Sequence, residues 1–178
     1  MKRYTAQINA ALPVIAIDLG YSAKVRSCGF AHSGAVETHN LFFGECIAAA
    51  AELINAQGPH MLILEAVLST YHLPNGNPEI RGDFEKGRGW YYGPGVSTFA
   101  AAFRLLQVLD GQLQESIRPL PLVEGFLSYK KNRTEHCDDA WRMLREFATA
   151  ERFIAQKGSE AIHQQIEGIP QILRFNAP

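Results

Sequence analysis

Two short apolar segments, each ending in a carboxylate, constrain the fold of this chain more than any other feature. Residues 14–17 are rich in β-branched side chains and end at Asp18, and Gly20 and Ser22 then favour a turn. Residues 61–64 form a continuous apolar run, typical of a strand buried on both faces of a sheet, which Glu65 ends. If these strands are adjacent and parallel, Asp18 and Glu65 lie side by side at the carboxyl edge of the sheet.

The rest of the chain alternates between strand and helix patterns. Three further strands are expected, at residues 27–31, 36–43 and 120–127. Three helices are expected, at residues 45–57, from Ser97 or Thr98 to Leu113, and at residues 135–155. Residues 159–166 can extend as a short helix. The order of elements predicts an α/β fold in which a central mixed five-stranded sheet is flanked by helices.

The length predicts one domain over residues 1–178, with a core at about 13–155, a long loop at 71–96 and a C-terminal tail at 158–178. A chain of this size buries enough surface to fold without a disulfide framework or a structural metal. Its three cysteines form no CxxC pair, which fits a reducing cytoplasm. No apolar run reaches 18 residues, so a membrane span is not expected.

The charge balance restricts how the chain can contact nucleic acid. Lys and Arg number 17 against 18 for Asp and Glu, a formal net charge of −1. This balance excludes the bulk polycation that binds nucleic acid or anionic lipid by charge alone. Any nucleic-acid contact must therefore come from local patches.

The acids at the strand ends have a third partner in the sequence. Asp138 and Asp139 open the last expected helix, whose N-terminus can bring them to Asp18 and Glu65. Carboxylates held within a few ångströms repel one another, and hard oxygen ligands of this kind select Mg²⁺ or Mn²⁺. Two such ions about 3.5–4 Å apart can activate water for phosphodiester hydrolysis. Each acid taken alone also has a structural explanation, as a turn former or a helix cap.

Three short motifs resemble the ribonuclease H-like superfamily. Residues 15–22 (IAIDLGYS), followed by 28–31 (CGFA), resemble its opening hairpin, in which the first acid ends strand one. Residues 62–66 (LILEA) resemble the fourth-strand acid of the RuvC-like, Holliday-junction resolvase branch. Residues 136–140 (HCDDA) resemble the last motif of the family, which opens the final helix. The acid order Asp, Glu, Asp is that of the resolvases.

The resemblance implies a ribonuclease H-like fold and a divalent-metal-dependent nuclease that acts on DNA or RNA, with branched DNA as one candidate substrate. It implies that Asp18, Glu65 and Asp139 bind Mg²⁺ or Mn²⁺. Asp138 would replace or assist Asp139, and His136 would position the nucleophilic water or the scissile phosphate. The two-fold symmetry of resolvases makes a homodimer the expected assembly. If Asp18, Glu65 and Asp139 share metal ions, their carboxylates must lie within about 8 Å of one another, since a larger separation prevents shared metals.

Two groups of residues are candidates for binding the substrate. Lys130, Lys131 and Arg133 precede the acidic helix and are either a phosphate clamp or solvated surface cations. The long loop combines cations and stacking faces at Arg81, Arg88 and Trp90. The alternative is that the aromatic side chains of this loop pack it onto the domain or form a dimer contact. Glu124, in the fifth expected strand, is either a further acid near the site or, by default, a side chain at a solvent-facing edge.

Two other functions fit parts of the sequence. A non-catalytic nucleic-acid-binding or assembly subunit can keep the same fold without cleaving its ligand. An actin-like nucleotide-binding domain is the second alternative, because residues 17–22 also resemble the first phosphate loop of that group. Such proteins need two domains and a second glycine-rich loop, whereas Glu65 is followed by Ala-Val-Leu.

Overall fold

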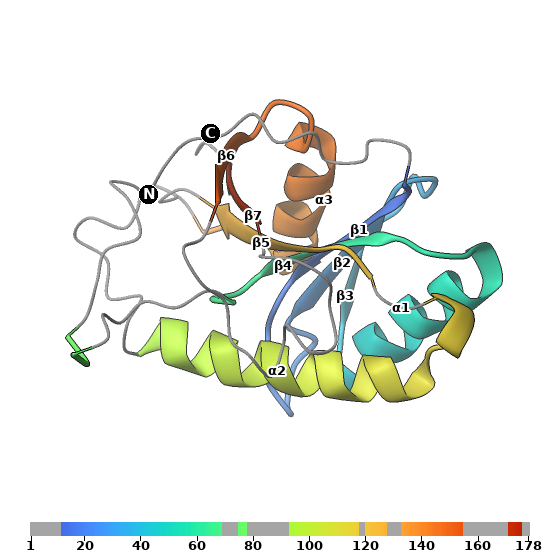
Figure 1. The fold of residues 1–178 in the computed structure, drawn as a ribbon, viewed down its shortest axis with the longest axis horizontal. Coiled ribbons are helices and arrows are strands. Elements are labelled where there is room, and N and C mark those ends of the chain that lie inside the picture. The colour runs from blue at the N-terminus through green and yellow to red at the C-terminus, as the bar shows by residue number, and fades with distance from the viewer. Residues whose placement is uncertain are drawn as a thin grey trace.

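A mixed sheet forms the centre of the computed structural model, which describes residues 12–68, 75–77, 93–117, 120–127, 133–154 and 171–175 (Figure 1). Within these residues the strand order is β3-β2-β1-β4-β5-β7-β6. The strands span Val14–Asp18 (β1), Cys28–His32 (β2), His39–Leu41 (β3), Met61–Glu65 (β4), Leu122–Leu127 (β5), Glu151–Ile154 (β6) and Gln171–Phe175 (β7).

The middle of the sheet is parallel and its two borders are antiparallel. β1, β4, β5 and β7 run in one direction, while the β1-β2-β3 hairpins and the β6-β7 pair are antiparallel. The register pairs Asp18 with Glu65 across β1 and β4. The two strand-end acids therefore lie side by side at the carboxyl edge of the parallel strands, as expected.

Helices cover both faces of the sheet, as Figure 1 shows, with α1 (Phe43–Gln57) and α2 (Pro94–Gln112) on one face and α3 (His136–Glu146) on the other. A short 3-10 helix, Glu115–Ile117, follows α2. Alternate side chains of β1 and β4 face opposite ways, because successive residues of a strand point to opposite faces. Ile15, Ile17, Leu62 and Leu64 pack with residues of α1 and α2. Val14, Ala16, Met61 and Ile63 pack with Met143 of α3.

The start and stop of α1 follow from local hydrogen bonds. The Glu45 carboxylate accepts the backbone N–H of Phe42 at 3.0 Å, which satisfies a donor just before the helix. Gly58 has a φ of +93°, and its N–H bonds to the carbonyl of Ile54 at 2.8 Å. Glycine adopts such a conformation without the strain that a Cβ would add. The chain can then turn directly into β4.

The α/β class and the mixed sheet flanked by helices are confirmed, and the sheet continues beyond the five expected strands with β6 and β7. The helix expected at 135–155 is wrong in length, because α3 ends at Glu146 and residues 151–154 form β6. The carbonyl of Glu146 accepts both the N–H and the hydroxyl of Thr149, at 3.0 and 3.2 Å. These bonds close a turn that ends the helix.

Smaller differences concern other element ends. β3 is shorter than the strand expected at 36–43, and α1 begins two residues earlier than expected, at Phe43. α2 begins at Pro94 rather than at Ser97 or Thr98. Proline suits a first helical position because it lacks the N–H that would have no partner there. Among the helices that the structure describes, none has the length and apolar character needed to cross a membrane.

Candidate metal centre

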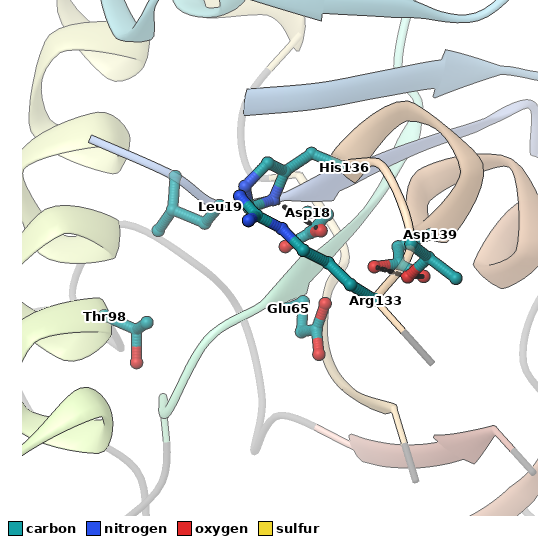
Figure 2. Close-up of a pocket in the computed structure, with 8 residues that line it drawn as sticks. Asp18, Leu19, Glu65, Thr98, Arg133, His136 and Asp139 are labelled. Carbon is teal, nitrogen blue, oxygen red and sulfur yellow. Dashed lines mark hydrogen bonds and ion pairs between the residues drawn. The ribbon is translucent and has the colours of Figure 1, made fainter. Parts of the chain in front are cut away.

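The three acids of the sequence motifs meet at one end of the sheet. Asp18 ends β1 and Glu65 ends β4, in register with each other. Because side chains alternate along a strand, Asp18 and Glu65 face the α3 side of the sheet. The residues on the same face of these two strands, which are buried there, are Val14, Ala16, Met61 and Ile63. Asp139 comes from the first turn of α3 on that same face (Figure 2).

The carboxylates lie close enough to share a cation. One oxygen from each of Asp18, Glu65 and Asp139 lies within 4.8 Å of the other two, well inside the expected limit. Asp18 is 7% exposed and Asp139 is 3% exposed. Carboxylate oxygens are hard ligands of the kind that Mg²⁺ and Mn²⁺ prefer in proteins. The donor set and its spacing therefore fit Mg²⁺ or Mn²⁺.

His136 contacts the first of these acids. Its Nδ1 lies 2.8 Å from Oδ2 of Asp18, the contact drawn as a dashed line in Figure 2. A neutral imidazole with its proton on Nδ1 donates this hydrogen bond and fixes the orientation of the carboxylate. The His136 side chain is 45% exposed, so it lies at the border between the site and solvent.

Thr134 contacts the third acid. Its hydroxyl oxygen lies 2.8 Å from Oδ1 and 2.9 Å from Oδ2 of Asp139. Sequence reasoning missed this residue, because a threonine two residues before a helix has many local uses. The sequence signal that could have indicated Thr134 was its position between Arg133 and the acidic motif at residues 136–140.

The start of α3 is docked onto the antiparallel border of the sheet. A Cβ at Gly29 of β2 would overlap the carbonyl oxygen of His136, so the helix lies directly on the β2 backbone. The Asn40 side chain of β3 accepts the N–H of Cys137 at 2.8 Å. Glu135, the residue before the helix, makes no side-chain cap. Asn40 therefore supplies a helix cap from 97 residues away in the sequence.

The acids line an open pocket of about 330 Å³. Figure 2 shows Thr98 on the α2 side of this pocket and Asp139 on the α3 side. Arg133 also lines it and is exposed. In the part of the chain that the structure describes, Arg133 forms neither an ion pair nor a hydrogen bond. Among the described residues, the lining consists of Asp18, Leu19, Glu65, Thr98, Arg133, Thr134, His136 and Asp139.

Two acids of the sequence analysis lie elsewhere. Asp138 is exposed and is not part of the carboxylate group, so the structure brings Asp139 rather than Asp138 to Asp18 and Glu65. The solvent-facing edge assigned to Glu124 is wrong: β5 lies between β4 and β7, and Glu124 is 1% exposed. Its Oε2 accepts the N–H of Leu68 at 3.0 Å. Glu124 thus satisfies buried backbone just after β4.

Five candidate substrate contacts lie outside the described residues, namely Arg81, Arg88, Trp90, Lys130 and Lys131. Of the predicted contacts, the structure therefore places Arg133 alone, and it places this side chain at the pocket.

Comparisons of the chain with protein-family models, with curated proteins and with solved structures give no match.

Proposed function

We propose that this protein is a ribonuclease H-like, divalent-metal-dependent nuclease that hydrolyses phosphodiester bonds in DNA or RNA. The observation that carries the proposal is the convergence of the Asp18, Glu65 and Asp139 carboxylates to within 4.8 Å. These acids occupy the positions that the sequence resemblance implies, at the ends of β1 and β4 and in the first turn of α3. Carboxylates held this close repel one another, and a bound divalent cation would offset that repulsion.

The three acids, His136 and Arg133 have separate parts in this mechanism. Asp18, Glu65 and Asp139 would hold a divalent cation through their carboxylate oxygens. Mg²⁺ or Mn²⁺ bound there would supply Lewis acidity for activation of water. His136 contacts Asp18 through Nδ1 and, with its proton on that atom, would orient the carboxylate and help to position the nucleophilic water or the scissile phosphate. Arg133 binds the anionic phosphate with its guanidinium donors.

The test compares the wild type with Asp18→Asn, Asp139→Asn and Asp138→Asn. Asp138→Asn is the matched control, because it removes the same charge from the neighbouring position outside the carboxylate group. Isothermal titration with Mn²⁺ measures metal binding, and circular dichroism checks that every variant is folded. Labelled four-way junction, linear duplex, single-stranded DNA and RNA are then incubated with Mg²⁺ or with EDTA.

We expect Mn²⁺ binding and cleavage in the wild type and in Asp138→Asn, and neither in Asp18→Asn or Asp139→Asn. Cleavage by the wild type should stop in EDTA. Nucleic-acid binding without cleavage of any substrate would instead support a binding subunit. Metal-dependent ATP turnover without cleavage would support a nucleotide-binding domain.

A further inference from the structure

Thr134 holds the Asp139 carboxylate at both oxygens. The two distances, 2.8 and 2.9 Å, place the hydroxyl almost equally far from Oδ1 and Oδ2. A hydroxyl has one proton to donate, so it bonds to either oxygen in turn and stays at the same edge of the carboxylate. Rotation of Asp139 about its side-chain bonds would break this contact. The hydroxyl therefore restricts the orientation of an acid that is 3% exposed.

The backbone that follows Thr134, at the start of α3, is held by hydrogen bonds. Cys137, three residues later, donates its N–H to Asn40 of β3. The Asp139 N–H bonds to the carbonyl of Glu135 at 3.2 Å, within the first turn of α3. Thr134 and Asp139 thus lie on either side of an anchored helix start. A fixed donor on a fixed backbone can set the direction of a ligand more closely than a mobile side chain can.

We propose that Thr134 is a positioning residue that orients Asp139 for binding of a divalent cation, an inference that rests on the proposed metal site. Groups that hydrogen-bond to a metal ligand fix its geometry, and their removal typically weakens metal binding about 10–100-fold. Thr134 acts through Asp139 and does not itself bind the cation. Its role therefore shows as a change in metal affinity rather than as a loss of the fold.

The experiment measures the Kd for Mn²⁺ by isothermal titration in the full chain. Thr134→Val removes the hydroxyl and keeps the shape, Thr134→Ala is a second hydroxyl-free variant, and Thr134→Ser keeps the donor. Thr98→Val is the matched control, because Thr98 lines the same pocket but its hydroxyl bonds to the Gly95 carbonyl of its own helix at 3.1 Å. Thermal unfolding of each variant shows whether it is folded at the titration temperature.

We expect Mn²⁺ to bind about 10–100-fold more weakly to Thr134→Val and Thr134→Ala, with Thr134→Ser and Thr98→Val close to the wild type. Wild-type affinity in the folded hydroxyl-free variants, together with loss of binding in Asp139→Asn, would overturn the positioning role alone. An equal loss in Thr134→Ser would overturn it as well. A wild type that binds no Mn²⁺ would overturn the proposed metal site, and this inference with it.

Discussion

At the scale of single residues, Arg133 brings a positive charge to a pocket lined by three carboxylates. The side chain is exposed, and it has no ion pair within the described residues. A metal held by the acids would cancel much of their negative charge, which leaves the guanidinium donors for an anion. Because guanidinium matches the geometry of phosphate oxygens, Arg133 is suited to hold a nucleic-acid backbone beside the metal site.

We expect Arg133→Gln to weaken nucleic-acid binding and to lower the slope of log Kd against log salt concentration by about 1, because one phosphate contact is lost. Affinity for Mn²⁺ should not fall, since Arg133 is not a ligand. Fluorescence anisotropy with a labelled oligonucleotide over a salt series measures both quantities. Arg104→Gln is the control, because Arg104 is exposed on α2 and does not line the pocket. Equal losses in the two variants would mean that net charge, not this site, determines binding.

At the scale of elements, the start of α3 decides whether the site forms. β2 pairs Gly29 with Asp18, and His136 lies directly over Gly29. The absence of a side chain at Gly29 is therefore what lets the helix bring His136 to Asp18. Asn40 of β3 then caps the same helix end. Two strands of the antiparallel border thus hold the helix whose first turn supplies Asp139.

Gly29→Ala should lower the free energy of unfolding by about 1–3 kcal/mol, because the added methyl group meets backbone that must move. Mn²⁺ binding should weaken as well, since α3 carries Asp139. Chemical denaturation and Mn²⁺ titration measure the two effects. Gly111→Ala in α2 is the control: its Cβ meets no atom within 4 Å, and the change should leave stability equal or raise it by about 0.5–1 kcal/mol. Wild-type behaviour of Gly29→Ala would contradict the close approach of α3.

Local patterns predicted the elements that carry the acids, and non-local contacts explain what those patterns missed. The apolar runs that end in Asp18 and Glu65 contain the information for a buried strand within a few residues. The contact of Asn40 with Cys137 joins positions 97 residues apart, so no local window contains it. β6 likewise depends on its pairing with β7, where Phe153 is opposite Ile172. The apolar spacing within residues 135–155 therefore predicted a helix where residues 151–154 form a strand.

At the scale of the whole molecule, the two ends of the parallel strands carry different ionisable groups. The carboxylates lie at the carboxyl ends of β1 and β4, whereas His60 immediately precedes β4 at its amino end. His60 is fully buried, and its Nδ1 lies 2.8 Å from the carbonyl oxygen of Gly58. Its Nε2 has no hydrogen-bond partner among the described residues. Protonation of His60 can therefore change stability without involving the candidate metal site.

Burial lowers the pKa of His60 below its usual 6.5, and the nearby His32 lowers it further, against the opposing effect of the Gly58 carbonyl. The neutral ring is thus favoured by folding. The stability that burial of the neutral His60 ring provides is complete above the unfolded pKa near 6.5, and it is lost as the pH falls from there to the lower folded pKa.

We expect the wild type to lose more stability than His60→Asn between pH 7.5 and pH 5.5, a range of about one unit on either side of the unfolded pKa of histidine. An asparagine amide can still donate to Gly58 but does not titrate. Thermal unfolding of both proteins without metal measures this difference, and parallel pH profiles would show that burial of His60 does not govern acid sensitivity.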